Sequence, residues 1–212
     1  MSVSLKKGQK VDLTKDNAGL KRVVVGLGWD EAEQPGAKGV FGSLFGSNRE
    51  KVQAIDCDAV AFLLDSDGKI ADRDDVIFFN NLRHSSGYII HHGDNLTGAG
   101  EGDDEQITVE LSKLPKQYDK VVILVSIYKA TDRNQHFGMI KNAFIRIVDY
   151  DTNKELCIYN LSENYDDMTA LVFGELYRKN NEWKFNAIGQ PLKIWSIAEL
   201  AERYGLPRSV WY

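Results

Sequence analysis

The sequence predicts an all-β protein, an antiparallel β-sandwich of about ten strands with one or two short helices. Three observations support this fold class. Short apolar runs recur along the whole chain, clusters of turn residues separate these runs, and helical periodicity is confined to a few short stretches. The 212 residues show no internal repeat and no domain boundary, so we expect one domain that spans residues 1–212.

The apolar runs have the length and composition of β-strands. The run at 106–111 alternates apolar and polar residues, which is typical of a strand with one buried face. The run at 121–128 is apolar almost throughout, which favours a central strand. In chain order, the predicted strands cover residues 22–27, 54–64, 76–79, 87–92, 106–111, 121–128, 143–148, 155–160, 169–178 and 183–188.

Turn-forming residues connect several of these runs. Residues 65–68 (Asp-Ser-Asp-Gly), 150–153 and 179–182 are predicted to be hairpin connections. The first of them resembles the start of an EF-hand calcium loop. No glutamate follows it at the required distance and no helices flank it, so we interpret it as a turn. Ser196 is predicted to cap a helix over 197–204, and residues 135–141 are expected to add a short helical turn.

The cysteines and the N-terminal residues indicate a compartment. Cys57 and Cys157 lie within strand-like runs and have no CxxC neighbour, which favours buried free thiols over a disulfide. The first residues lack the apolar core of a signal peptide. No run approaches the ~20 apolar residues of a membrane helix. We therefore expect a soluble, cytoplasmic protein.

The most unusual segment is GDNLTGAGEGDDE, residues 93–105, which we call the acidic glycine loop. Its five acidic residues have no Lys or Arg among them, and they account for the whole formal net charge of −5. Since the rest of the chain is balanced, general nucleic-acid binding is disfavoured. The glycines allow tight turns with carbonyls directed inward, and such dense negative charge requires water or a cation to offset it.

Other oxygen-bearing side chains are expected to join this loop. Asp56 and Asp58 lie two residues apart in an otherwise apolar strand, so both should project from one face. Asp30 ends an earlier strand, and Asp75 and Asn80 flank a later one. Convergence of these strand ends at one edge of the sandwich would form a single cluster. The candidate metal ligands are Asp30, Asp56, Asp58, Asn80, Asp94, Asn95, Asp103, Asp104 and Glu105.

This set of oxygen donors favours calcium. Magnesium prefers a tight octahedron that retains several waters, and zinc prefers His or Cys ligands. The number of acids suggests two ions, because one calcium rarely needs more than three or four carboxylates. His91 and His92 are adjacent on a strand and should point to opposite faces, which disfavours a His ligand. A merely solvated acidic loop is the alternative, but two unpaired carboxylates inside an apolar strand would be costly to bury.

Several motifs together resemble the TerD family of tellurium-resistance and stress proteins. They are residues 25–30 (VGLGWD), 56–58 (DCD), 78–81 (FFNN), the acidic glycine loop, 142–146 (NAFIR) and 174–178 (GELYR). The resemblance covers about residues 3–189 and is closest to the TerZ-type branch because of the glycine-rich stretch 36–48. It implies a β-sandwich that binds two calcium ions in bacterial tellurite resistance and stress response.

The function predicted from these observations is a calcium-dependent interaction module without catalytic activity. Other stress or tellurium-resistance proteins would be its partners. One alternative is a metal-dependent hydrolase, although no nucleophile–base arrangement or phosphate loop is apparent. Another is calcium-dependent membrane docking, in which the apolar residues of the stretch 36–48 insert into lipid, unless that stretch folds back over the sandwich. Those residues are Val40, Phe41, Leu44 and Phe45.

Overall fold

The computed structural model describes residues 2–31, 54–93, 102–161, 163 and 165–211. The strands in these ranges are β1 (Val3–Leu5), β2 (Lys10–Asp12), β3 (Val23–Glu31), β4 (Cys57–Leu64), β5 (Val76–Ile77), β6 (Ile89–His91), β7 (Glu105–Val109), β8 (Lys120–Ile127), β9 (Ile140–Asp149), β10 (Lys154–Asn160), β11 (Ala170–Lys179) and β12 (Glu182–Leu192). The helices are α1 (Ile197–Arg203) and three short 3₁₀ turns, η1 (Arg73–Asp75), η2 (Phe137–Met139) and η3 (Arg208–Trp211).

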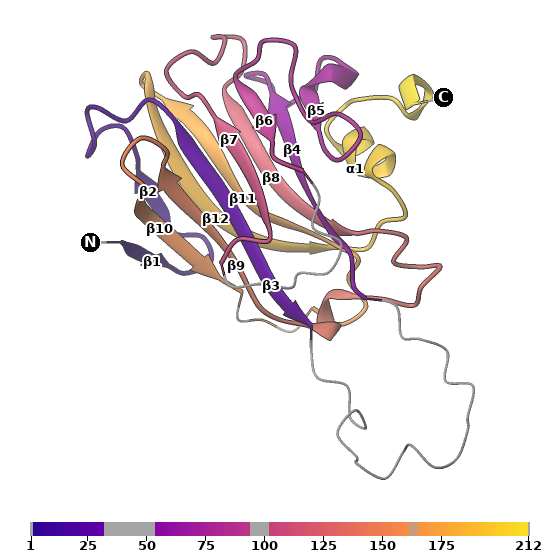
Figure 1. Cartoon of the computed structure of the whole chain (residues 1–212). Coiled ribbons are helices and arrows are strands. Elements are labelled where there is room, and N and C mark those ends of the chain that lie inside the picture. Colours follow the sequence, from indigo (N-terminus) through magenta and orange to yellow (C-terminus); the bar gives the residue numbers. More distant parts are fainter. Residues whose placement is uncertain (1, 32–53, 94–101, 162, 164, 212) are drawn as a thin grey trace, which may run out of the picture.

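The strands form two six-stranded sheets that face each other as a β-sandwich (Figure 1). Sheet A has the strand order β1-β10-β9-β3-β7-β6, and sheet B has the order β2-β12-β11-β8-β4-β5. Every pairing is antiparallel except that of β1 with β10. The predicted antiparallel sandwich is thereby confirmed.

All ten predicted strands are present as β3 to β12, and β8 lies centrally in sheet B between β11 and β4. Ser196 caps α1 as expected, because its hydroxyl accepts a hydrogen bond from the Glu199 N–H at 3.2 Å. Residues 65–68 form the predicted turn, in which Asp65 Oδ1 accepts from the N–H groups of Asp67 and Lys69 at 2.9 Å. The strands β1 and β2 were not predicted.

Apolar side chains fill two layers. One core lies between the sheets and includes Cys57, Ala59, Ala61 and Leu63 from β4. The other lies on the outer face of sheet B, where Val60, Phe62 and Leu64 of β4 pack under Leu200, Ala201 and Leu206. Because both faces of β4 are covered, its whole sequence is apolar apart from Asp58.

Some expectations concern parts of the chain outside the described residues. The residues Val40, Phe41, Leu44 and Phe45 belong to the stretch 32–53, and Asp94 and Asn95 belong to the stretch 94–101. In the described ranges, no helix has the length and apolar character needed to cross a lipid bilayer.

Candidate functional site

The candidate site begins at the start of β4, where two aspartates flank a cysteine. Cys57 belongs to the core between the sheets, so strand alternation turns Asp58 to the outer face of sheet B. Asp56 and Asp58 are both buried. Arg133 Nη1 lies 3.6 Å from Asp56 Oδ2, and the Asp56 carbonyl accepts a hydrogen bond from the Tyr128 N–H at 2.8 Å. The first aspartate therefore sits beside a cation from the loop after β8.

Glu105, the first residue of β7, reaches from sheet A to sheet B. Its side chain is buried and accepts a hydrogen bond from the Ala59 N–H of β4. This N–H is available because β5 pairs with β4 only at Ala61 and Phe62. Glu105 thus closes an edge of sheet B that the short strand β5 leaves open.

His91 completes this closure. Its Nε2 lies 3.2 Å from the Ala59 carbonyl oxygen and 3.5 Å from Glu105 Oε2. Its Nδ1 accepts a hydrogen bond from the Gly93 N–H at 3.1 Å, so the ring proton belongs on Nε2, which donates. Both ring nitrogens of His91 therefore have protein partners.

Asp103 lies on the outer face of sheet A. Its carboxylate forms a bidentate ion pair with Arg146 of β9, with Nε–Oδ1 and Nη2–Oδ2 distances of 2.7 and 3.1 Å. Gln106 Nε2 also donates to Asp103 Oδ2 at 3.0 Å. The space that Asp103 occupies exists because position 26 on β3 is glycine. The carboxylate is almost fully buried and neutralised by its partner.

Asp104 holds the end of β3. Its Oδ2 accepts a hydrogen bond from the Trp29 N–H at 2.8 Å, and its own N–H donates to the Leu27 carbonyl at 2.7 Å. Burial raises the pKa of Asp104, the charges of Asp30 and Asp103 raise it further, and the Trp29 hydrogen bond opposes the change. A cation beside Asp104 would stabilise the charged carboxylate and so oppose this rise in pKa.

The remaining two described candidates are exposed. Asp30 accepts a hydrogen bond from Asn142 Nδ2 at 2.8 Å and contributes to the negative potential at Asp104. Asn80 lies in the tight turn between Phe78 and Asn81.

The thiol of Cys57 is affected electrostatically by four of the candidate acids. Burial raises the pKa of this thiol well above its ordinary value, and four negative charges raise it further. These charges belong to Asp58, Glu105, Asp56 and Asp104. These acids belong to β4, β7 and the segments that precede the two strands.

The described donors do not by themselves enclose an ion. Within the described ranges, no three His, Cys, Asp or Glu side chains converge at metal-binding distances. The Asp103 carboxylate is paired with Arg146. The carboxylates of Asp56, Asp58 and Asp104 have the oxygen-donor chemistry that a hard cation prefers. Asp94 and Asn95 of the acidic glycine loop lie outside these ranges.

The structure also reveals a buried polar network that sequence reasoning missed. Asp75 Oδ1 accepts a hydrogen bond from the Tyr118 hydroxyl at 2.6 Å and lies 3.2 Å from His84 Nε2. His84 Nδ1 lies 2.7 Å from Ser86 Oγ. This Ser–His–Asp order resembles a catalytic triad, but Asp75 also caps η1 by accepting from the N–H groups of Ala71 and Asp72. Asp75 therefore anchors the chain around β5, and no spacing in the sequence would have indicated it.

Comparison with known proteins finds relatives that are similar to this chain along almost its whole length. The family model described as "TerD domain" matches residues 1–204. The chain is 48% identical over 206 residues to general stress protein 16U of Bacillus subtilis (strain 168), covering 97% of this chain and 98% of that protein. It is 42% identical over 198 residues to tellurium resistance protein TerZ of Serratia marcescens, covering 93% of this chain and 94% of that protein.

A solved structure shares the fold. It is described as a homologue of telluride resistance protein (TerD) from Streptomyces coelicolor A3(2), and it superposes with a TM-score of 0.61 at 23% sequence identity. The superposition covers 89% of this chain and 100% of that one.

Proposed function

The chain belongs to the TerD family, and from this premise we propose that it is a cytoplasmic calcium-binding protein of bacterial stress response and tellurite resistance. It acts as an interaction module whose partner contact depends on metal occupancy. The partners are other stress or tellurium-resistance proteins. The names of its relatives, general stress protein 16U and tellurium resistance protein TerZ, support the biological setting.

One observation carries the calcium proposal. Asp56 and Asp58 are both buried at the start of β4, and Glu105, where the acidic glycine loop joins β7, accepts a hydrogen bond from the Ala59 N–H of the same strand. Asp56, Asp58 and Asp104 would hold two calcium ions together with Asp94 and Asn95 of the loop. Bound calcium would supply positive charge that offsets these carboxylates.

Asp103 and Glu105 have a supporting role in this proposal. The ion pair of Asp103 with Arg146 fixes the end of the loop on sheet A. The hydrogen bond from Ala59 to Glu105 fixes the next residues against β4 of sheet B. Asp104 lies between these two anchors, so its carboxylate is positioned before an ion arrives. Asp30 and Asn80 are more exposed and would contribute at the periphery.

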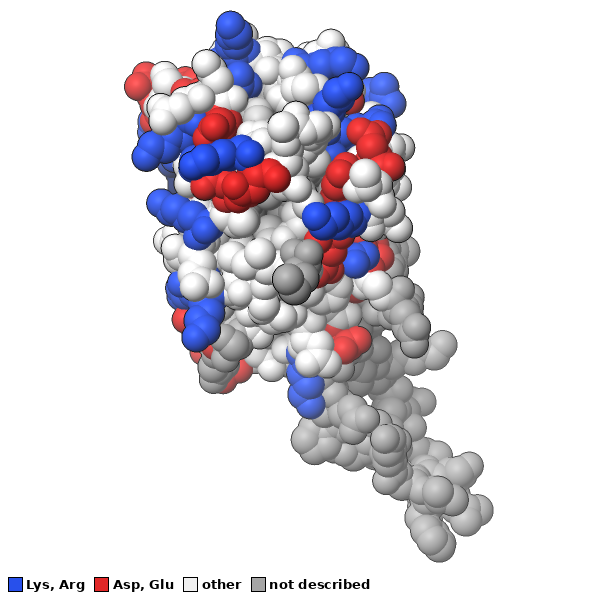
Figure 2. Space-filling view, turned by 90° about the vertical axis from the view of Figure 1, so that its left-hand side faces the viewer, with Lys and Arg blue, Asp and Glu red and all other residues white. Residues whose placement is uncertain are grey.

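The surface supports a protein partner rather than a nucleic acid. On the face in Figure 2, Lys and Arg side chains are interspersed with Asp and Glu, without a basic stripe among the described residues. Several of these charges are paired, such as Lys7 with Glu163 at 2.7 Å and Arg22 with Asp151 at 2.8 Å. Binding of nucleic-acid phosphates requires a surplus of basic side chains along one face.

The cysteines support a reducing compartment. Cys57 and Cys157 are both free and buried. Burial raises the pKa of the Cys157 thiol to about 12, and the Cys57 thiol is raised well above its ordinary pKa by burial and by nearby acids. Thiols of this kind are poor nucleophiles, which argues against direct reduction of tellurite by this chain.

Titration calorimetry tests the calcium proposal. We expect the chelator-treated protein to bind calcium at micromolar concentration and magnesium more weakly. The Asp56→Asn and Asp104→Asn variants should each weaken calcium binding by at least about tenfold, as the loss of a charged ligand implies. The Asp67→Asn variant, altered in the exposed turn after β4, is the matched control and should bind like the parent. A folded parent that takes up no calcium would remove the proposal.

A further inference from the structure

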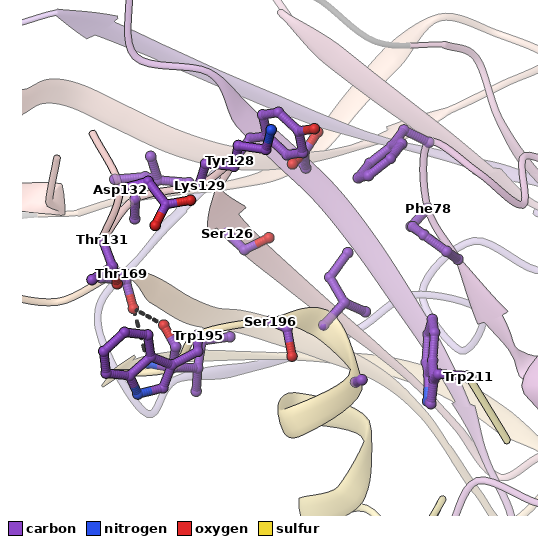
Figure 3. A pocket seen from close by; sticks show the side chains of 17 residues that line it. Phe78, Ser126, Tyr128, Lys129, Thr131, Asp132, Thr169, Trp195, Ser196 and Trp211 are labelled. Atoms are coloured by element: carbon purple, nitrogen blue, oxygen red, sulfur yellow. Dashed lines mark hydrogen bonds between the residues drawn. The ribbon is translucent and has the colours of Figure 1, made fainter. Parts of the chain in front are cut away.

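A cavity of about 350 Å³ lies on the outer face of sheet B, between the end of β8, the loop that follows it and the start of α1. Figure 3 shows Trp195 on one side of this cavity and Phe78 and Trp211 on the opposite side. The volume lies at the lower end of the range of small-molecule sites. The cavity is therefore large enough for a compact ring compound.

One wall of the cavity consists of four aromatic rings that contact one another. Trp211, Phe78, Phe79 and Tyr128 follow in that order, with successive ring centroids 5.7, 5.2 and 5.9 Å apart. The last two pairs are edge-to-face, with interplanar angles of 76° and 85°. Because such contacts restrict the orientation of each ring, this wall presents a preformed aromatic surface to the cavity.

The opposite side of the cavity is formed by an indole that is mostly exposed. Trp195 is 77% exposed, the highest value among the large hydrophobic residues described. Its backbone is held in place, because its N–H donates to Glu199 Oε2 at 3.0 Å. The preceding residue, Ile194, is held by the Thr169 hydroxyl, which donates to the Ile194 carbonyl at 2.8 Å and accepts from its N–H at 2.9 Å (Figure 3). An exposed ring on a fixed backbone is a surface that a bound molecule would cover.

The polar lining residues on the strands are already closed to solvent. Asp58 is 4% exposed, Ser126 is 7% exposed and Thr169 is 6% exposed. Asp58 also takes part in an interaction within the protein. A ligand would therefore remove little water from these three residues. Most of the area that it covers would belong to aromatic and aliphatic side chains, and the burial of such area favours binding.

The exposed polar residues of the lining form what we call the polar mouth. They are Lys129, Thr131, Asp132 and Ser196. Lys129 and Asp132 carry opposite charges, and the Lys129 ammonium lies over the Tyr128 ring, 5.3 Å from the centroid. The mouth therefore has no surplus charge of either sign that would attract a charged ligand.

We propose that this cavity binds an uncharged aromatic small molecule, with its rings between Trp195 and Phe78 and any polar substituent toward the polar mouth. Burial of the rings against aromatic walls provides most of the affinity. A saturated molecule of the same shape would lose the ring–ring contacts. A carboxylate would approach the acids Asp58 and Asp132, and an ammonium group would have to share Asp58 with the interaction that this residue already makes.

This inference goes beyond the proposed function and does not rest on it. Asp58 lines the cavity and is also a candidate calcium ligand, but the binding of an uncharged ring compound does not use its charge. Ring binding can be measured without calcium, in the presence of a chelator. Failure of the aromatic site and failure of the calcium site are then separate results.

Four probes with one bicyclic skeleton separate the effects of aromaticity and charge. They are 2-naphthol, decahydro-2-naphthol, 2-naphthoate and 2-naphthylmethylamine, of which the last two are charged at neutral pH. In calorimetry on the full chain with chelator, we expect 2-naphthol to bind with a Kd below about 1 mM. The saturated alcohol and the amine should each bind at least about threefold more weakly, and 2-naphthoate at least about tenfold more weakly.

Variants of the two walls locate the binding site. Trp195 is exposed, so Trp195→Ala should fold normally and weaken 2-naphthol binding about fivefold, whereas Trp195→Phe keeps a ring and should stay within about twofold of the parent. Phe79→Leu removes a ring from the opposite wall and should weaken binding about threefold. Tyr150→Ala removes an exposed ring that follows β9 of sheet A and should have no effect.

Three results would overturn the proposal. The first is 2-naphthol binding no more tightly than its saturated and charged counterparts. The second is unchanged affinity in Trp195→Ala, which does not depend on any folding defect in Phe79→Leu. The third is no binding of 2-naphthol to the folded parent at about 2 mM.

Discussion

The Asp103 carboxylate lies directly over Gly26, in a space that a side chain at position 26 would fill. The two residues are far apart in sequence, and the antiparallel pairing of β3 with β7 and β9 brings them together. Gly26 pairs with Gln106 on one side and Arg146 on the other, which are the two residues that donate hydrogen bonds to Asp103. The end of the acidic glycine loop is therefore attached to sheet A through a gap in its side-chain surface.

We predict that Gly26→Ala destabilises the protein by about 1–3 kcal/mol, because the new methyl group displaces Asp103 from Arg146 and leaves a buried charge poorly paired. Urea unfolding measures this change. Gly19→Ala is the matched control, since a methyl group there would meet no atom within 4 Å. Equal stability of the Gly26→Ala variant and the parent would show that Asp103 does not need this position.

We predict that the Tyr118–Asp75 hydrogen bond contributes to stability at neutral pH and less under acid. Burial opposes ionisation of Asp75, but hydrogen bonds from His84, Tyr118 and the backbone outweigh it and lower its pKa below 3.8. The stabilisation is therefore fully present at a pH above the pKa that Asp75 has in the unfolded chain. It is lost as the pH falls through the lower pKa that Asp75 has in the folded protein. Tyr118→Phe should cost about 1 kcal/mol at pH 7 and less at pH 3.

Urea unfolding at both pH values measures the Tyr118→Phe effect. Tyr88→Phe, a change at a partly buried tyrosine on the adjoining segment, serves as a control and should lack this pH dependence. An equal cost of Tyr118→Phe at pH 3 and pH 7 would contradict the role assigned to the charged form of Asp75.

We predict that calcium raises the melting temperature. A ligand at about 100 times its Kd adds roughly 2.7 kcal/mol to the free energy of unfolding, which corresponds to about 5–10 °C for a chain of this size. Chelation should reverse the shift, and Asp104→Asn should reduce it. Scanning calorimetry with calcium, magnesium and chelator checks this, and identical melting in all three would count against it.

We predict that neither thiol reacts in the folded protein. Burial raises the pKa of the Cys157 thiol to about 12. Burial and the charges of nearby acids raise the pKa of the Cys57 thiol well above its ordinary value. Labelling with a disulfide reagent at pH 8 should proceed only after urea is added. Cys57→Ser together with Cys157→Ser should leave any tellurite resistance intact. Loss of resistance in a folded double variant would show that a thiol takes part.

The sequence predicted the longer strands well because their composition reflects their burial. The continuous apolar run of β8 arises because both faces of sheet B are covered, and the alternation in β7 arises because sheet A has one face toward solvent. The strands β1 and β2 have three residues each, too few for a periodic signal. Their pairing is determined by distant partners, β10 and β12.

The candidate site was predicted in composition but not in geometry. The types and positions of the acids follow from the sequence, and the structure shows Asp56, Asp58 and Glu105 to be buried. The sequence could not show that Asp103 lies on the outer face of sheet A, because the direction of its side chain depends on the register of β3, β7 and β9. Nor could it show that Asp58 borders a cavity, because the other lining residues come from separate parts of the chain, between Phe78 and Trp211.

The apolar layer on the outer face of sheet B depends on residues near the end of the chain. The matched family region stops at residue 204, yet Leu206 and Trp211 still seal the layer above Phe62 and Phe78. A chain that ends at residue 204 would expose the apolar side chains that Leu206 and Trp211 cover. It would also lose Trp211 from the lining of the cavity beside Phe78. Such a shortened chain should aggregate more readily than the full-length chain, because apolar surface would be exposed to solvent.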